Sequence, residues 1–263
     1  MSAVRLEEGT VPGNDSGGVR SVQRAVDLLA LYDADHPSRT VRELTDATGL
    51  AKSTVVRLVH TLEQSGLLWS RGDGRTVPGP SLLRWADLAR FTWQLPEAAL
   101  VRMKELSEAS DGEAVHLYVR QQRARICIAR HEGTRTLRHV VRVGEEMPLW
   151  SGAASHILLS RAERPDIDAI AAQAPHPDWA ETLWERSRRA AVQGWSASHG
   201  EREAGVSGVA APVFDRDGRL VAAIALGGPT TRFTDEAVAT FAAALVATAR
   251  DLTALDCIGD PTR

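Results

Sequence analysis

Apolar side chains recur every three or four positions from Arg20 onward, which is the spacing of one face of an α-helix. Thr40, followed three residues later by Glu43, has the spacing of a capping box and predicts the start of a second helix. Gly49 predicts the end of that helix, because glycine adopts a left-handed turn without a steric penalty. The residues predicted to face the core from these two helices are Val22, Ala25, Val26, Leu28, Leu29, Val41, Leu44 and Thr48.

A third helix is predicted from about residue 52 to 64, and a two-stranded hairpin follows it. Beyond Gly66 the apolar pattern changes to a period of two, with a Gly-Asp-Gly turn between strands at 67–70 and 75–77. This is the layout of a winged helix-turn-helix, whose second helix enters the major groove of DNA. The residues predicted to contact DNA are Lys52, Ser53, Thr54 and Arg57 on the helix and Arg71 and Arg75 at the wing tip.

The segment 81–95 is predicted to form a linker helix that is apolar around most of its circumference. Its large apolar side chains are Leu82, Leu83, Trp85, Leu88 and Phe91. Soluble monomers rarely expose a contiguous apolar patch of that size. The segment therefore predicts at least a homodimer, in which a partner covers the helix.

Beyond residue 95 the pattern alternates between helices and strands. The predicted helices lie near 97–109, 151–160, 166–173 and 178–193, and the predicted strands lie near 113–119, 125–131 and 137–142. A hairpin with strands at 206–213 and 220–228 follows, and a terminal helix begins at Thr234. The chain as a whole is therefore predicted to belong to the α+β class.

Composition narrows the class of protein further. The 263 residues are 43% hydrophobic and 25% charged, which suits packed cores and excludes global disorder. Two cysteines are too few for a disulfide framework. No apolar run reaches the ~18 residues that span a bilayer, and residues 1–19 are predicted to be a flexible arm rather than a signal peptide. A cytoplasmic protein with no membrane partner is expected.

The charge pattern bears on how DNA would be bound. The net charge of −3 gives the chain no basic character, so DNA binding would depend on a local surface. Residues 20–79 hold eight Lys and Arg residues against seven Asp and Glu residues. One copy is expected to bind DNA weakly, so two copies with two recognition helices are needed.

Two stretches resemble the IclR family of bacterial transcriptional regulators. The family's DNA-binding domain is similar to SVQRAVDLLALYDADHPSRTVRELTDATGLAKSTVVRLVHTLEQSGLLWSRGDGRTVPGP, and its effector-binding domain is similar to GEREAGVSGVAAPVFDRDGRLVAAIALGGPTTRFTDE. The resemblance implies a winged helix-turn-helix domain at 20–80, a linker helix at 81–95 and a GAF-like α/β effector-binding domain at 96–263. It also implies a double-stranded DNA operator, a small-molecule effector, and dimers that often pair into tetramers. No cofactor is implied.

The resemblance also places an effector pocket beside the hairpin, where the amides of Gly152 and Ala153 would hold a carboxylate. Family members that bind small keto or hydroxy acids carry polar groups where this chain has Ser198, Gly208 and the run 225–229, so we expect a bulkier aromatic acid, such as a hydroxybenzoate. Its ring would contact Trp150 or Trp195, unless both are plain core residues. The predicted effector-binding residues are Trp150, Ser151, Gly152, Ala153, Trp195, Ser198, Gly208, Ala225 and Gly227.

Other features favour ordinary explanations. Seven arginines between Arg120 and Arg142 are expected on a solvated sheet face rather than in an anion site. The histidines lack the spacing of a metal site, and neither a nucleophile elbow nor a phosphate-binding loop is present, so an enzyme is not expected. Two alternatives stay open for the helix-turn-helix: a solvated packing module, or a dimeric module that binds protein partners.

Overall fold

The computed structural model describes residues 19–176 and 178–258, and its internal contacts divide the chain into two units between Thr92 and Trp93. Each unit has a hydrophobic core of its own. The arm predicted over residues 1–19 lies outside the described residues, apart from Val19, which precedes the first helix.

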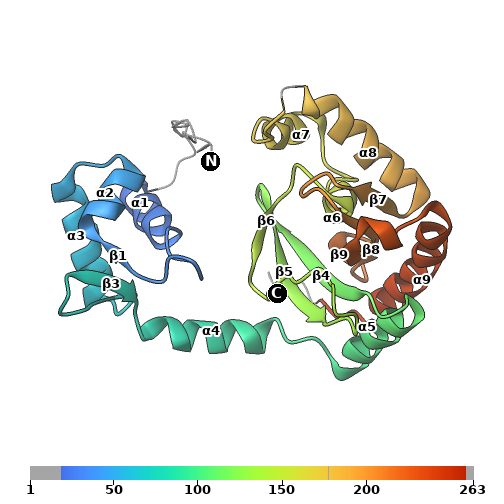
Figure 1. Cartoon of the computed structure of the whole chain (residues 1–263), viewed down its shortest axis with the longest axis horizontal. Coiled ribbons are helices and arrows are strands. Elements are labelled where there is room, and N and C mark those ends of the chain that lie inside the picture. The colour runs from blue at the N-terminus through green and yellow to red at the C-terminus, as the bar shows by residue number, and fades with distance from the viewer. Residues whose placement is uncertain (1–18, 177, 259–263) are drawn as a thin grey trace. The chain divides into compact units, whose positions relative to one another are not determined.

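The N-terminal unit is built from three short helices and a small sheet (Figure 1). Its elements are α1 (Arg20–Leu29), β1 (Arg39–Thr40), α2 (Val41–Thr48), α3 (Lys52–Gln64), β2 (Leu68–Ser70) and β3 (Arg75–Pro78). The sheet is antiparallel in the order β1-β3-β2, so β2 and β3 form the wing that the sequence predicts. The core residues are Leu28, Leu44, Val55, Val59, Leu62 and Leu68.

The start and end of α2 follow the local chemistry of its sequence. The Thr40 hydroxyl accepts a hydrogen bond from the Glu43 amide at 3.2 Å, and the Glu43 carboxylate accepts one from the Thr40 amide at 2.7 Å. This is the predicted capping box. Gly49 ends the helix in the left-handed conformation, with φ of 63°. Residues close together in sequence therefore determine where α2 begins and where it ends.

The first helix differs from its prediction. Val22 and Val26 are more than half exposed, although their spacing predicts a core-facing side, and Leu28 is the residue that α1 buries. Helical spacing identifies an apolar stripe but not which structure covers it. The strand β1, which adds a third member to the wing, is also absent from the prediction.

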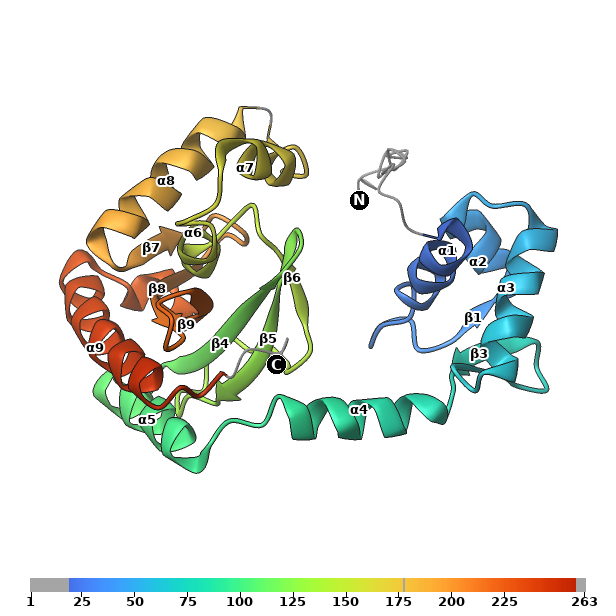
Figure 2. The same cartoon turned by 180° about the vertical axis from the view of Figure 1, so that it is seen from behind.

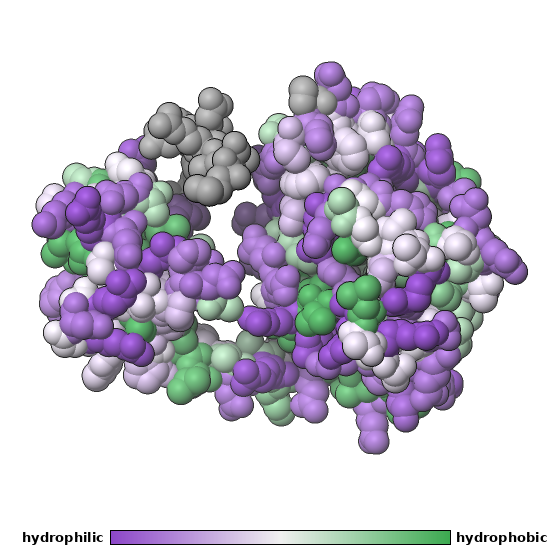
Figure 3. Space-filling model, viewed as in Figure 1, coloured by the Kyte–Doolittle hydropathy of each residue, from purple (hydrophilic) through white to green (hydrophobic). Residues whose placement is uncertain are grey.

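The helix α4 (Ser81–Thr92) follows the wing and buries none of its side chains within its own chain. Leu83 is 74% exposed and Phe91 is 78% exposed, and Trp85 and Leu88 are each about half exposed. Figure 3 shows apolar side chains at the surface of this segment. The apolar surface predicted for the linker helix is therefore present.

The C-terminal unit is an antiparallel six-stranded sheet with helices on both faces (Figures 1 and 2). Its strands are β4 (Ala114–Gln121), β5 (Ala124–His131), β6 (Glu146–Pro148), β7 (Ser196–His199), β8 (Val206–Phe214) and β9 (Leu220–Pro229), in the order β6-β5-β4-β9-β8-β7. One face is covered by α5 (Glu97–Ala109) and α9 (Asp235–Ala254). The other is covered by α6 (Ala153–Leu158), α7 (Arg164–Ala171) and α8 (Trp179–Gln193).

Alternation along β9 separates the two cores. Ile224 and Leu226 pack with α5 and α9, whereas Ala223 and Ala225 face α6 and its neighbours. The side chains on the α6 face of this strand are small, and Gly227 continues that row. The sheet therefore leaves room on the α6 face that large side chains would fill.

Two strand predictions in the C-terminal unit need correction. Residues 137–142 contain no strand, and the edge of the sheet is formed by β6 instead. The strand β7 was not predicted, because Ser-Ala-Ser-His is short and weakly apolar and its strand character depends on pairing with β8. The helix α9 is long and apolar enough to span a membrane by composition alone, but Phe241 and Leu245 pack in the core beside the sheet.

Candidate functional site

One face of α3 carries polar side chains that the core leaves free. Lys52, Ser53 and Arg57 are exposed and Thr54 is partly exposed. The buried residues of the helix are Val55, Val59 and Leu62. No side chain caps the start of α3, whose preceding residue is an alanine, so the first backbone amides of the helix stay available to an anion. This face has the polarity and shape that a DNA groove requires.

The two wing arginines differ. Arg71 lies at the exposed start of the turn between β2 and β3. Arg75 is the first residue of β3, and its guanidinium donates to the Ser38 hydroxyl at 2.9 Å and pairs with Glu43 at 3.3 Å. Arg75 does lie beside the wing turn, opposite Arg71, but its side chain turns away from the wing tip and ties the wing to the capping box of α2.

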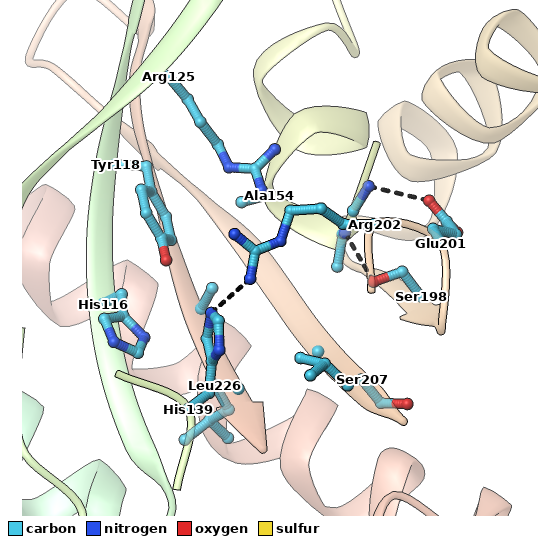
Figure 4. A pocket seen from close by; sticks show the side chains of 16 residues that line it. His116, Tyr118, Arg125, His139, Ala154, Ser198, Glu201, Arg202, Ser207 and Leu226 are labelled. Carbon is cyan, nitrogen blue, oxygen red and sulfur yellow. Dashed lines mark hydrogen bonds between the residues drawn. The ribbon is translucent and has the colours of Figure 1, made fainter. Parts of the chain in front are cut away.

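A cavity of about 60 Å³ lies in the C-terminal unit between the sheet and the start of α6 (Figure 4). Six elements contribute to its wall, namely β4, β5, α6, β7, β8 and β9, together with the irregular segments that carry His139, Gly152 and Glu201. The lining residues are His116, Tyr118, Arg125, His139, Gly152, Ala153, Ala154, Ser198, Glu201, Arg202, Val206, Ser207, Gly208, Ala225, Leu226 and Gly227.

Six of the nine predicted effector-binding residues line this cavity, namely Gly152, Ala153, Ser198, Gly208, Ala225 and Gly227. Trp150, Ser151 and Trp195 do not. Trp150 packs against the core on the α6 side and its carbonyl accepts a hydrogen bond from the Trp179 indole at 2.5 Å. Trp195 packs against the core on the α5 and α9 side. Neither tryptophan lines the cavity in this structure and both pack, partly buried, against a core, which favours the alternative that they are core residues; a ring contact with the effector stays a prediction.

The backbone amides at the start of α6 are already used within the chain. The Gly152 amide donates to the Glu201 carboxylate at 2.9 Å, and the Ala153 amide donates to the Ser198 hydroxyl at 3.0 Å. The structure therefore places one of the chain's own carboxylates where the sequence predicts the carboxylate of an effector.

Glu201 is held by several positive or polar groups. Its side chain is 8% exposed, pairs closely with Arg186 and lies 3.2 Å from His156 Nε2. Burial by itself would raise the pKa of Glu201, but the contacts with His156, the Gly152 amide and Arg186 outweigh it and hold the pKa below its ordinary value. Glu201 is therefore an ionised and well compensated carboxylate.

The space left by the small residues is filled by other side chains. A Cβ on Gly227 would lie 3.1 Å from the His139 ring, and one on Gly208 would lie 3.1 Å from the Leu226 carbonyl oxygen. Figure 4 shows the Arg202 side chain reaching across the cavity to His139. The space beside Gly227 is therefore taken by His139 and the space beside Gly208 by the Leu226 carbonyl.

Arg125 and Arg202 line the cavity, although the sequence analysis predicts neither of them as a binding residue. Arg125 is 5% exposed, and its Nη1 donates to the carbonyls of Pro148 at 2.7 Å and Ser151 at 2.6 Å and to the Ser155 hydroxyl. Arg202 donates to His139 Nε2 at 3.2 Å and to Met147 Sδ at 3.1 Å. The expectation that the arginines of 120–142 are all solvated is wrong for Arg125.

A sequence clue to Arg125 does exist. It lies two residues before Cys127 in a strand, so alternation places both side chains on one face of the sheet, and Cys127 is fully buried. The prediction placed Arg125 on a solvated face because arginine is charged, although its alternation with Cys127 indicates a buried position. Arg202 lies in an irregular segment, where no periodicity applies, so only the fold shows that it enters the cavity.

The histidines of the cavity are held neutral. Burial, followed by the positive charge of neighbours that include Arg202, lowers the pKa of His116 to about 3 and that of His139 to about 4. Because an arginine only donates, the Nε2 of His139 must accept from Arg202, which places the ring proton on Nδ1. Among the described residues, no group of three or more His, Cys, Asp or Glu side chains could hold a metal ion.

Comparison with known proteins gives family matches over both units. Residues 21–71 match the IclR helix-turn-helix domain, and residues 92–254 match the C-terminal domain of bacterial transcriptional regulator IclR. The HTH-type transcriptional regulator KipR of Bacillus subtilis is 29% identical over 224 residues, which cover 82% of this chain and 89% of KipR.

Solved structures share the same architecture. An IclR-family transcriptional regulator from Rhodococcus sp. is 43% identical with a TM-score of 0.61, covering 94% of this chain and 98% of that one. An IclR homolog from Microbacterium hydrocarbonoxydans, complexed with 4-hydroxybenzoate, is 22% identical with a TM-score of 0.67, covering 89% and 99%. At that identity the second likeness concerns the fold alone.

Proposed function

The chain belongs to the IclR family of bacterial transcriptional regulators, and from this premise we propose that it binds an operator as a dimer and responds to a small carboxylic acid. The general function follows from the family: the protein is a DNA-binding transcriptional regulator with an effector-binding domain, and it is not an enzyme. A bacterial protein with this function would act in the cytoplasm, where the DNA is.

We assign the DNA contacts to the exposed face of α3. Lys52 and Arg57 would reach base edges or phosphates, Ser53 and Thr54 would bind phosphate oxygens near the uncapped helix start, and Arg71 would contact the backbone from the wing. Arg75 would act indirectly, because it holds the wing against α2. The observation that carries this assignment is the exposed polar face of α3 opposite its buried valines.

The oligomer is proposed from α4. Leu83, Trp85, Leu88 and Phe91 are exposed in the described part of the chain, and covering them with the same helix of a second copy would remove them from water. Two copies would also supply the two recognition helices that a nearly neutral DNA-binding unit needs. Pairing of dimers into tetramers through the C-terminal units stays part of the proposal.

For the effector we propose a carboxylate, with an aromatic acid such as a hydroxybenzoate as the first candidate. The fold accommodates such an acid in the Microbacterium homolog. The cavity of about 60 Å³ is smaller than the ~150 Å³ cavity that holds benzene in another protein, so an aromatic ring would require His139 or Arg202 to move. Effector binding would then change DNA affinity by favouring one arrangement of the two DNA-binding units over another.

A gel-shift titration tests the proposal. The full-length protein is expected to retard the DNA upstream of its own reading frame at a concentration where unrelated DNA of equal length stays free. Calorimetry with benzoate and 4-hydroxybenzoate against pyruvate and glyoxylate then identifies the acid class, and the bound acid is expected to change the gel shift. Equal retardation of both DNAs would contradict the proposal, and tight binding of the keto acids alone would contradict the aromatic acid.

A further inference from the structure

The start of α6 is not free to receive an acid group. Glu201 accepts the Gly152 amide and Ser198 accepts the Ala153 amide, so both donors that would hold an incoming carboxylate are satisfied. Glu201 is also paired with Arg186 and lies close to His156. An effector would have to break this compensated cluster to bind there, whereas the cavity also offers two arginines whose charge is less well compensated.

Arg125 is a buried cation without a carboxylate partner among the described residues. Its Nη1 is satisfied by two carbonyls and a hydroxyl, but its Nε is buried and has no hydrogen-bond partner. A buried charge is costly unless it is paired, and burial lowers the pKa of Arg125 to about 10. Glu201 attracts it only at longer range and already has Arg186. This arrangement suits an anion that the chain itself does not supply.

Arg202 supplies a second guanidinium to the same cavity. Its charged neighbour Glu203 lies 3.7 Å away with a side chain that is 66% exposed, so that pair is weak. Its other contacts are to the neutral His139 ring and to the sulfur of Met147. Figure 4 shows both guanidinium groups directed into the cavity from opposite walls. The charged side chains of the wall are thus two weakly compensated cations and the fully compensated Glu201.

We infer that the acid group of the effector binds to the guanidinium groups of Arg125 and Arg202, and not to the backbone amides at the start of α6. This inference rests on the proposed function, because it identifies how the regulator would recognise its ligand. Guanidinium groups bind carboxylates through paired, charge-assisted hydrogen bonds. The site therefore selects ionised carboxylates over neutral amides of the same shape. Glu201 keeps its contact with Gly152 while the ligand is bound.

The test uses the full-length protein, a set of simple carboxylates (acetate, benzoate and 4-hydroxybenzoate) and the matching amides. Thermal unfolding and calorimetry are measured for the wild type and for Arg125→Met, Arg202→Met and Glu201→Gln. The control is Arg123→Met, which removes one exposed arginine next to β5 and leaves the cavity unchanged. Arg125→Lys keeps a charge at the buried position if Arg125→Met fails to fold.

The wild type and Arg123→Met are expected to bind at least one carboxylate saturably and none of the amides. Affinity is expected to fall at least tenfold in Arg202→Met and in Arg125→Met, and to be unchanged or modestly higher in Glu201→Gln. Unchanged affinity in the two arginine variants would overturn the inference. The inference would also be overturned if none of the carboxylates bound to the wild type. A tenfold gain in carboxylate affinity in Glu201→Gln, without a loss of affinity in the arginine variants, would overturn it as well, because it would place the acid group on the amides of α6.

Carboxylate binding and the gel shift are separate measurements, so failure of this inference can be distinguished from failure of the proposed function. One possible result is that the arginine variants lose carboxylate binding, while no carboxylate alters the gel shift of the wild type. That result would retain the site and reject ligand control of DNA binding. A gel shift that carboxylates alter equally in the wild type and in Arg202→Met would retain the function and reject the site.

Discussion

The two units of this protein place their charges in opposite ways. In the N-terminal unit the candidate binding groups, such as Lys52 and Arg57, lie within six consecutive residues and are exposed on one helix. In the C-terminal unit the corresponding groups, Arg125 and Arg202, are far apart in sequence and meet inside a cavity between the sheet and α6. One unit presents a charged surface to a large polyanion, and the other encloses a small site.

The difference shows what it costs to position a charge in each unit. An exposed arginine keeps its hydration, so α3 needs only correct helix boundaries and a packed inner face. A buried arginine loses its hydration and must be supplied with acceptors, as the carbonyls of Pro148 and Ser151 do for Arg125. Substitutions should therefore affect DNA binding in the first unit, and both folding stability and ligand binding in the second.

The largest expected effect concerns α4. DNA binding by the N-terminal unit depends on this helix if two copies must bind the operator together. Replacing Leu83 and Phe91 by Asp should give a monomer, because two charges would lie in the proposed contact. Operator affinity should fall by about a hundredfold or more through loss of the second half-site. Light scattering and gel shift measure the two effects, with Gln94→Asp as the matched control. A double variant that remains dimeric would place the contact elsewhere.

A buried charge of the C-terminal unit gives the next effect. Glu113 is 1% exposed and forms two contacts with Arg232, one of them at 2.9 Å. Glu113→Ala should lower the free energy of unfolding by about 3 kcal/mol, because it leaves Arg232 without its partner. Glu105→Ala, which removes a half-exposed partner of Arg102, should cost less than about 1 kcal/mol. Urea unfolding measures both, and equal losses would contradict the contrast between buried and exposed charges.

In the N-terminal unit the corresponding substitution should change DNA binding and leave stability intact. Arg57→Ala should weaken operator binding by about 1 to 3 kcal/mol if Arg57 contacts a base, with no change in melting temperature or dimer mass. Arg250→Ala, which removes an exposed arginine from α9, is the control. A footprinting titration that finds the same affinity and salt dependence in both variants would remove Arg57 from the interface.

The last effect is a pH dependence confined to the enclosed site, and it is small for any one step of pH. Burial lowers the pKa values of His116 and His139 in the folded chain to about 3 and about 4, against 6.5 for an ordinary histidine. Below pH 6.5 the unfolded chain binds protons that the folded chain does not, so stability should fall as pH falls from 6.5 to about 4. Each histidine should contribute about 1 kcal/mol per pH unit.

Two histidine variants test this dependence by urea unfolding at several pH values. His116→Asn should reduce the slope of stability against pH by about one proton. His60→Asn, which replaces an exposed histidine on α3, should leave it unchanged. A slope that both variants share with the wild type would mean that another group titrates.

Much of the fold was predictable where structure depends on neighbours in the sequence. The capping box at Thr40, the turn at Gly49, the boundaries of α3 and the wing hairpin are all confirmed. The helix α9 also begins directly after Thr234, as predicted, and the Thr234 hydroxyl caps it. Failures occur where pairing partners decide the outcome, as in β7 and the missing strand at 137–142.

The candidate cavity was predicted in position but not in chemistry. The resemblance located Gly152, Ser198 and Gly227 at its wall. It could not show that the Glu201 carboxylate would accept the Gly152 amide, since a residue two positions beyond the end of a strand has no periodicity that reveals its contacts. The tryptophans were assigned to the ligand although their size and apolar rings equally suit a core, which is where they pack.

The sequence by itself determined most of the helices, the wing hairpin, the cap of α2, the polar face of α3 and the apolar surface of α4, because these depend on groups within a few residues of one another. Only the tertiary structure decided which charges are buried. Arg125 and Arg202 enter one cavity because strand order and an irregular segment bring them together, and Arg75 leaves the wing tip because Glu43 and Ser38 lie within its reach. The free energy of a charge depends on what surrounds it in space, and the order of residues along the chain does not specify those surroundings.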